Sequence, residues 1–426
     1  MEFPEEFLHF IWQFRLFNTT KLYTAAGEQI EIIQTGILNK NAGPDFSEAK
    51  LKIGHTLWVG NVEIHLKSSD WLLHQHQTNY AYENVILHVV DEDDVPIYRR
   101  DGTLIPVLVV NGLFPHYLLN NYEALINSAN YFPCEKQIQQ VDEFLVNGFL
   151  SRVLVERLEQ KSEEVNSKLA LQKGDWEVTF YHFLARNFGF KVNGVPMEML
   201  AQSLPLQLFA KHKTNPLQIE ALIFGQAGFL NQKFEEEYPK KLKREYLFLQ
   251  KKYQLQPIER SVWKFMRMRP QNFPTLRLAQ FAALIINSNH LFSKMLSANH
   301  QTELIQLFEN LPVNPFWLNH YHFNKKTTNV NLQMGKSSIA NIMVNTLSLF
   351  LFAYGKAIDN NIYQDRALAL LENLPAERNA IIDKYLAAGL SIQNAFSSQA
   401  ILQLKKMYCQ EKKCLNCGIG TRILKG

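Results

Sequence analysis

Residues 41–76, NAGPDFSEAKLKIGHTLWVGNVEIHLKSSDWLLHQH, carry the pattern that decides the fold of the N-terminal region. Asp45 precedes one segment with strand-like alternation, and Glu63, His65 and Lys67 occupy every second position of the next one. Because alternate side chains of a strand share a face, these three polar side chains are expected on one face of a sheet. Two carboxylates beside a basic group form a site for a hard divalent cation and the water that it activates. The pattern therefore makes a metal-dependent nuclease the first hypothesis.

The segments around this stretch predict an α/β domain. Apolar residues at helical spacing predict a helix over residues 4–15, and alternation predicts strands over residues 28–38, 47–53, 57–67 and 85–90. A short helix is expected over residues 71–82, two short strands within residues 95–110, and a connection over residues 111–142. The order of helix, three strands, helix and strand is typical of a sheet flanked by helices.

The remainder of the chain is expected to be helical. A chain of 426 residues is too long for one ordinary core, so it predicts two or three domains. After about residue 143 strand patterns nearly vanish, and segments such as DWEVTFYHFLARNFG show helical spacing. We therefore predict an α/β domain over residues 1–142 and a larger all-α domain over residues 143–426.

Charge and hydropathy restrict the class of protein. The net charge of +4 permits an anionic partner such as a nucleic acid but does not require one. We find no run near the roughly 18 apolar residues of a membrane span, the longest being residues 347–354. The acidic N-terminus MEFPEEFLHF lacks the features of a signal peptide. We expect a cytoplasmic protein with no membrane partner.

The motif around Pro44, Asp45 and Glu63 resembles the signature of the PD-(D/E)XK nuclease superfamily, and the segment order over residues 4–90 resembles its restriction-endonuclease-like core. The resemblance implies that Asp45 and Glu63 bind Mg²⁺ or Mn²⁺ and that a glutamate of the first helix, Glu5 or Glu6, assists. It also implies a basic residue that orients the attacking water.

The position of that basic residue departs from the superfamily pattern. His65 stands where the signature has a lysine, and Lys67 follows two residues later on the same face. Three interpretations follow: His65 replaces the lysine, Lys67 reaches back, or the site no longer catalyses.

The whole chain is also similar to a bacterial family of unknown function. The segments GPDF, GNVEIHLKSSDWLLHQH, RPQNFPTLRLAQ and CLNCGIG carry this second resemblance. It covers nearly the full length and implies no established activity.

Four histidines, at positions 65, 74, 76 and 88, lie close together in the sequence. His65 and one of the others form a candidate set of ligands for a softer cation such as Zn²⁺ or Mn²⁺. His74 and His76 are two residues apart on an expected helix, so we expect them to point in different directions. The favoured interpretation of His88 is a buried side chain bonded to a backbone carbonyl.

The four cysteines of the chain indicate a second metal site. Cys409, Cys414 and Cys417 form a C-x₄-C-x₂-C knuckle, and Cys134 is the remaining cysteine. Clustered cysteines in a cytosolic protein suggest metal before disulfide. If Cys134 completes the set, a structural Zn²⁺ is favoured over an iron–sulfur cluster, and four unligated thiols remain the plain alternative.

Two basic stretches are compatible with a nucleic-acid partner but do not establish one. Residues 239–253 mix Lys and Arg with aromatics, and Arg267, Arg269 and Arg277 follow Trp263. Such residues can hold phosphates and stack bases, although they are more often the solvated face of a helix. Two alternatives to a nuclease therefore remain: a nuclease-like fold that binds nucleic acid without cleavage, and a metal-dependent hydrolase of a small phosphate or other ester.

Overall fold

The computed structural model describes residues 3–298 and 300–426, which divide into two compact units. The first unit contains Met1–Phe149, Lys384–Leu390 and Leu404–Gly426, and the second contains Leu150–Asp383 and Ser391–Gln403. The chain leaves the first unit within the long helix α4 (Glu143–Leu171), and its C-terminal segment belongs again to the first unit.

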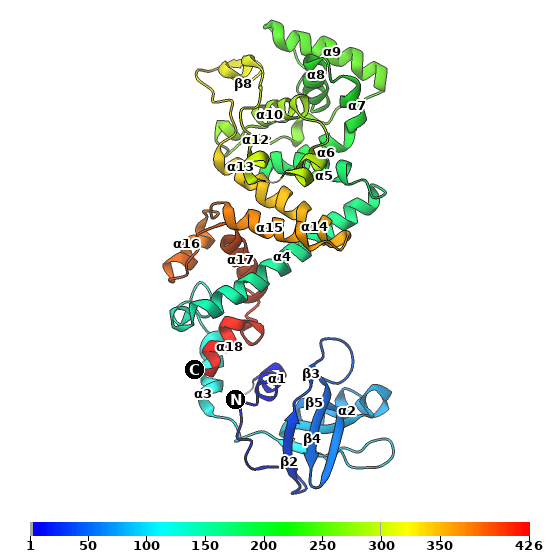
Figure 1. Ribbon diagram of the computed structural model, residues 1–426, viewed down its shortest axis with the longest axis vertical. Helices are drawn as coiled ribbons and strands as arrows, with labels where there is room; N and C mark the ends of the chain where they lie inside the picture. Colours follow the sequence, from blue (N-terminus) through cyan, green and yellow to red (C-terminus); the bar gives the residue numbers. More distant parts are fainter. Residues whose placement is uncertain (1–2, 299) are drawn as a thin grey trace. The chain divides into compact units, whose positions relative to one another are not determined.

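A mixed sheet forms the core of the first unit (Figure 1). Its strands lie in the order β1 (Leu22–Tyr23), β2 (Gln29–Gln34), β4 (Phe46–Ile53), β5 (Thr56–Lys67), β6 (Val85–Glu92) and β7 (Val107–Val109), and β3 (Ile37–Leu38) pairs with β4. Pairing is antiparallel from β1 to β5, whereas β6 runs parallel to β5 and β7 parallel to β6. The strands expected over residues 47–53, 57–67 and 85–90 are confirmed within two residues at each end.

Helices pack against the longest strand of this sheet. Both α1 (Glu5–Gln13) and α2 (Asp70–Leu73) contact β5, and Figure 1 shows them on either side of it. Helix α1 begins after Pro4, which has extended backbone angles, and it buries the apolar side chains of Phe7, Leu8, Phe10, Ile11 and Trp12. The helix expected over residues 4–15 is therefore confirmed, and it is anchored by its apolar face.

Three local predictions were wrong. The strand expected over residues 28–38 is split at Gly36, which has φ of 95° and where a Cβ atom would lie 2.6 Å from the Ser47 carbonyl oxygen. The helix expected over residues 71–82 is interrupted at Gln75, whose φ of 59° is left-handed. The connection expected over residues 111–142 contains a helix, α3 (His116–Ile126), which packs against the C-terminal helix α18 (Gly418–Lys425). Both exceptional φ values and long-range packing are poorly encoded in local patterns.

The second unit is built mainly from helices, as predicted. They are α5 (Trp176–Phe188), α6 (Phe190–Ser203), α7 (Leu206–Lys211), α8 (Pro216–Gln226), α9 (Glu237–Tyr253), α10 (Pro274–Asn287), α11 (Leu291–Ser297), α12 (Gln301–Gln306), α13 (Lys336–Ile342), α14 (Ser348–Ala357), α15 (Asn361–Asn373), α16 (Ala380–Ala387) and α17 (Ala395–Leu404), the last two lying only partly in it. The strands β8 (His320–His322) and β9 (Lys325–Lys326) form a small hairpin.

One helical run is longer and more apolar than we expected from the sequence, which predicted no candidate membrane span. This run, Lys336–Ala357, consists of α13, the π-helical turn η7 (Met343–Leu347) and α14. By length and composition it is long and apolar enough to cross a membrane. Within the unit, however, 67% of the apolar window is buried against other residues. A buried core helix passes the same test, so the run gives weak support for a membrane span.

Candidate metal centre

The two predicted acids meet at the start of β4. Asp45 immediately precedes β4, and Glu63 lies on the neighbouring antiparallel strand β5. The backbone N–H of Asp45 donates to Glu63 Oε2 at 3.1 Å, and the backbone N–H of Ile64 donates to Asp45 Oδ2 at 2.9 Å. Each carboxylate is thus held by the backbone of the opposite strand, and the two acids face a shared site.

Helix α1 adds two ligand-type side chains to this pair. Glu5 and His9 are four residues apart and therefore lie on one face of the helix. The His9 Nε2 atom lies 3.3 Å from Asp45 Oδ2 and 3.8 Å from Glu5 Oε1. Ligand atoms of Glu5, His9 and Asp45 all lie within 4.8 Å of one another. Of the two helix glutamates considered from the sequence, Glu5 joins the acids, whereas Glu6 is exposed; His9 was missed, although its spacing from Glu5 was a usable signal.

The carboxylates are crowded and poorly solvated. Burial and then the charge of Asp45 raise the pKa of Glu63 to about 8 and that of Glu5 to about 7. Burial disfavours the charged form of His9, but Asp45 first, with Glu5 and Glu6, outweighs this effect and raises the His9 pKa. The His9–Asp45 contact lacks hydrogen-bond geometry, so we attribute that rise to the nearby negative charge. Three carboxyl groups surround a single imidazole, so an added cation would balance their negative charge.

Three histidines form a second cluster around β5. His65 Nε2 lies 3.2 Å from His74 Nδ1, and ligand atoms of His65, His74 and His76 lie within 4.8 Å of one another. The expectation that His74 and His76 diverge was wrong, because the left-handed residue Gln75 turns the chain between them. A sequence pattern gives little warning of a left-handed glutamine.

His88 joins this cluster from the parallel strand β6. Its Nε2 atom lies 2.8 Å from His65 Nδ1, so the expected bond to a backbone carbonyl is replaced by a bond between two imidazoles. The reason is register, since His88 pairs with Glu63 across β5 and β6 and its side chain therefore points to the same face. Its Nδ1 atom has no hydrogen-bond partner among the described residues.

Glu63 connects the two clusters. Its Oε2 atom accepts the Asp45 N–H, while its Oε1 atom lies 3.2 Å from His76 Nε2 and 3.6 Å from His65 Nε2. Burial, reinforced by the neighbouring histidines, lowers the pKa of His65 to about 2 and that of His88 to about 3. Both imidazoles are therefore neutral at physiological pH, which is the form that ligates metal ions.

The Lys67 side chain pairs with a residue outside the group of acids. Its ammonium contacts Glu92 Oε2 at 2.9 Å, and both side chains are more than half exposed. Glu92 raises the Lys67 pKa through this contact. The backbone places Lys67 on the face of Glu63 and His65, but its side chain pairs with β6 rather than with the acids.

The predicted cysteines are gathered in the first unit as well. Cys134 lies in the loop after α3, and Cys409 ends the π-helical turn η8 (Lys405–Cys409). Cys414 begins the 3₁₀ turn η9 (Cys414–Asn416), and Cys417 directly follows it. All four are free thiols. The C-terminal knuckle and the distant Cys134 thus belong to the same compact unit.

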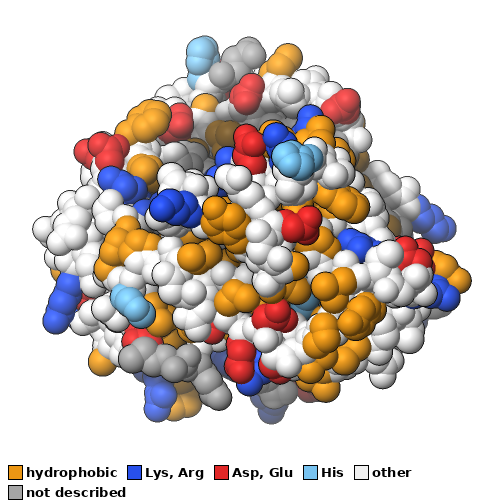
Figure 2. Space-filling view, turned by 90° about the horizontal axis from the view of Figure 1, so that it is seen from below, with side chains coloured by type: hydrophobic (Ala, Val, Ile, Leu, Met, Phe, Trp, Pro, Cys, Tyr) orange, Lys and Arg blue, Asp and Glu red, His pale blue; other side chains and the backbone are white. Residues whose placement is uncertain are grey.

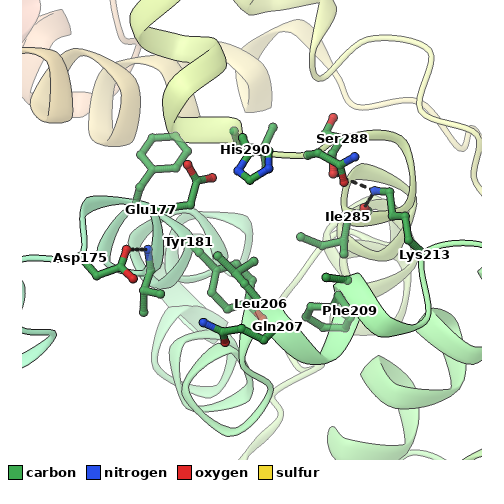
Figure 3. Close-up of a pocket in the computed structure, with 15 residues that line it drawn as sticks. Asp175, Glu177, Tyr181, Leu206, Gln207, Phe209, Lys213, Ile285, Ser288 and His290 are labelled. Atoms are coloured by element: carbon green, nitrogen blue, oxygen red, sulfur yellow. Dashed lines mark hydrogen bonds between the residues drawn. The ribbon is translucent and has the colours of Figure 1, made fainter.

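A pocket in the second unit has different chemistry. Its cavity of about 340 Å³ is lined mainly by apolar side chains, with Lys213, Glu177 and Asp175 among its polar residues (Figure 3). The Lys213 ammonium donates to the carbonyls of Ile285 and Ser288, Glu177 accepts the Phe292 N–H, and Asp175 caps α5. These polar groups hold helix ends and form no group of metal ligands.

Comparison with known proteins places the chain in a family without assigning it a reaction. No curated protein and no solved structure gives a significant match. Residues 5–380 match a protein family described as "Protein of unknown function (DUF2851)". This match spans the sheet, the carboxylate and histidine clusters and most of the helical unit. The chain therefore belongs to the DUF2851 family.

Proposed function

We propose that this protein is a divalent-metal-dependent hydrolase of phosphodiesters in nucleic acid, with its metal centre at Asp45 and Glu63. The observation that carries the proposal is the convergence of Glu5, His9, Asp45 and Glu63, whose crowded carboxylates are stabilised when a cation is added. Buried carboxylates of like charge are costly without such a partner. Hard cations take oxygen ligands of this kind.

The residues divide the work of hydrolysis between them. Asp45, Glu63 and Glu5 supply carboxylate oxygens for the cation. The imidazoles of His65 and His76 lie beside the Glu63 carboxylate. A bound divalent cation supplies charge neutralisation at the phosphate and activation of water. His76, whose Nε2 atom lies 3.2 Å from Glu63 Oε1, is suited to orient that water, the role that the lysine has in the PD-(D/E)XK signature. His65 stands at the lysine position of the signature, but both of its ring nitrogens lie within 3.2 Å of His88 and His74, so it supports the site through those histidines. Lys67 is excluded from this role by its pairing with Glu92.

Mn²⁺ is the preferred cation of the proposal. Carboxylates alone suit Mg²⁺ or Mn²⁺, whereas imidazoles suit the transition metals. The site combines both ligand types around Glu63. Mn²⁺ accepts both, so it should support the reaction better than Mg²⁺.

The element order supports a nucleic-acid substrate. Helix α1, the antiparallel strands β2, β4 and β5, and the parallel strand β6 follow the order expected of a restriction-endonuclease-like core. Surface charge adds little: on the face drawn in Figure 2, Lys and Arg are scattered among acidic and apolar side chains. Arg277 is buried and bonded to Asn272, Gln280 and Ser338, so it does not contact phosphate.

A second candidate is hydrolysis of a small phosphate ester at the histidine cluster. The observation that favours it is the grouping of His65, His74 and His76 within 4.8 Å, a ligand set suited to Zn²⁺ or Mn²⁺. In this case His74 is essential for metal binding, whereas the nuclease proposal requires Asp45 and Glu63.

The test is cleavage of labelled single- and double-stranded DNA and RNA by the full-length protein with Mn²⁺ or Mg²⁺. Asp45→Asn and Glu63→Gln remove ligand charge with little change of shape. Glu31→Gln, an identical change at an exposed position of β2, is the matched control. A small phosphodiester such as bis(p-nitrophenyl) phosphate is assayed in parallel, with His74→Ala.

Cleavage of a nucleic acid by the parent and Glu31→Gln, with loss in both site variants, is the expected result. Hydrolysis of the small ester alone, abolished by His74→Ala, would favour the second candidate. Salt-dependent binding of nucleic acid without turnover of any substrate would replace hydrolysis by recognition.

A further inference from the structure

The four cysteines come from separate stretches of the chain and meet in one unit. Cys134 lies before α4, and the three others follow α17, about 280 residues later in the sequence. Cys134, Cys414 and Cys417 are each less than 9% exposed. The described residues contain no disulfide between them. Since these are all the cysteines of the protein, every thiol of the chain lies in this region.

The thiols are close enough to influence one another's ionisation. Burial first, and then the charge of Cys409, raises the pKa of Cys414 to about 12, and burial also raises the pKa of Cys417 to about 12. Cys134 is shifted upward by burial and then by all three of the other cysteines. Ring packing joins the two segments directly: Phe132, two residues before Cys134, stacks on Tyr385 with 4.1 Å between ring centroids, and Tyr385 contacts Cys409. The loop of Cys134 therefore lies beside the Cys409 end of the knuckle.

Hydrogen-bond donors already point at two of the sulfurs. The Tyr385 hydroxyl donates to Cys409 Sγ at 3.2 Å, and the backbone N–H groups of Ile419 and Gly420 favour the thiolate form of Cys417. Donors of this kind stabilise thiolates bound to metal. At Gly420 a Cβ atom would lie 2.4 Å from the Cys414 carbonyl oxygen, so only glycine allows this approach.

Two lysines and a backbone irregularity complete the surroundings. Lys405 and Lys412 favour the thiolates of Cys409 and Cys414, respectively. Their ammonium groups are held near the site by the carbonyls of Tyr131 and Ile126. Cys409 is the last residue of the π-helical turn η8, and such turns occur often at functional sites.

We propose that Cys134, Cys409, Cys414 and Cys417 bind one Zn²⁺ ion as a four-thiolate structural centre. Each thiol gives its proton to solvent as its sulfur bonds to zinc, and no electron is transferred. The sulfurs are not as tightly grouped as the carboxylate and histidine clusters, so binding draws them inward. The ion fastens Leu404–Gly426 to the loop of Cys134 within the first unit. This centre is independent of the proposed hydrolase.

The experiment measures zinc and iron by mass spectrometry in full-length protein prepared under reducing conditions. We expect one zinc per chain at the cysteines in the parent, in Glu63→Gln and in His74→Ala, all of which keep the four cysteines. Cys134→Ser and Cys417→Ser should each lose it. Tyr385→Phe keeps the ring stacked on Phe132 and should retain zinc but release it faster to a chelator.

A second measurement covers the case in which the serine variants do not fold. Zinc is removed from the parent, Co²⁺ is added, and the thiolate-to-cobalt absorption is compared with that of a four-thiolate standard. Matching intensity supports the centre. Absence of the band, or zinc retained by folded Cys134→Ser, would overturn it; iron with acid-labile sulfide would overturn the choice of zinc.

Discussion

The two units both bury ionisable side chains, but they stabilise them differently. In the helical unit Arg277 is 4% exposed, and its two Nη atoms donate to neutral oxygens of Asn272, Gln280 and Ser338. In the sheet unit Glu63 is equally buried, yet it faces another carboxylate, Asp45, across β4 and β5. The Arg277 guanidinium has neutral acceptors on both Nη atoms, although its Nε has no hydrogen-bond partner among the described residues. The grouped carboxyls, by contrast, can all ionise together only beside an added cation.

Two other ionisable residues of the helical unit also have neutral hydrogen-bond partners. The Lys161 ammonium donates to Asn345 Oδ1 at 2.9 Å, and Asn314 Nδ2 lies 3.4 Å from Glu220 Oε2. Burial lowers the pKa of Lys161 to about 7 and raises that of Glu220 to about 7, so each can become neutral. Each of these groups is paired with a neutral amide, and our proposal assigns the chemistry to the sheet unit.

The largest effect is expected at Glu63. Glu63→Gln should lower the hydrolysis rate by more than about 100-fold, because changing even an outer partner of a metal ligand costs about 10–100-fold. Its melting temperature without metal should not fall at neutral pH, because burial raises the Glu63 pKa to about 8 and the carboxyl is then mostly uncharged. The rate and the thermal melt are measured on the same preparation. An unchanged rate of hydrolysis would contradict the proposal that the buried carboxylates of the sheet unit, unlike the buried charges of the helical unit, take part in the reaction.

Arg277 should show the opposite behaviour. Arg277→Ala removes three buried hydrogen bonds and leaves their acceptors unpaired, which should cost about 3 kcal/mol of stability. Hydrolysis per folded molecule should not change. Denaturant unfolding and activity are measured beside Arg269→Ala, an exposed control. A loss of activity in the folded Arg277 variant would give the helical unit a part in the reaction.

Glu220 provides a pH test of the same contrast. Its pKa is raised from 4.5 to about 7 in the fold, so the folded state binds a proton more tightly than the unfolded state. Stability from this group is greatest below pH 4.5 and falls as the pH rises to about 7, by up to about 3 kcal/mol. Urea unfolding between pH 4 and 8 should show a weaker fall for Glu220→Gln. Parallel curves for the two proteins would rule out this role.

The smallest effect is expected at Lys67. Its ammonium is exposed and paired with Glu92, so Lys67→Ala should leave the rate of hydrolysis unchanged. Glu92→Gln, which frees Lys67, should behave in the same way. A large loss of rate in Lys67→Ala alone would show that this lysine reaches the carboxylates during catalysis.

Local sequence patterns were sufficient for the centre of the sheet. Alternation around the turn Gly54–Thr56 predicted β4 and β5, and their antiparallel pairing brings Asp45 and Glu63 together. The apolar spacing of residues 4–15 predicted α1. Strong periodicity of this kind survives folding because one face of each element is buried.

The histidine cluster could not be predicted in the same way. It depends on the left-handed angle of Gln75 and on the parallel register that sets His88 beside Glu63. In the carboxylate cluster, the approach of His9 to Asp45 depends likewise on the docking of α1. Each of these is fixed by contacts between distant segments rather than by neighbours in the sequence. The contribution of His9 was the most accessible, because Glu5 and His9 lie one helical turn apart.

Mn²⁺ binding tests the central claim most directly. Isothermal titration of the full-length protein, with Glu63→Gln and the exposed control Glu31→Gln, measures whether the carboxylates around Glu63 hold the cation. The account predicts saturable binding by the parent and the control and at least a 100-fold weaker affinity in Glu63→Gln. Equal affinity in all three proteins would contradict it.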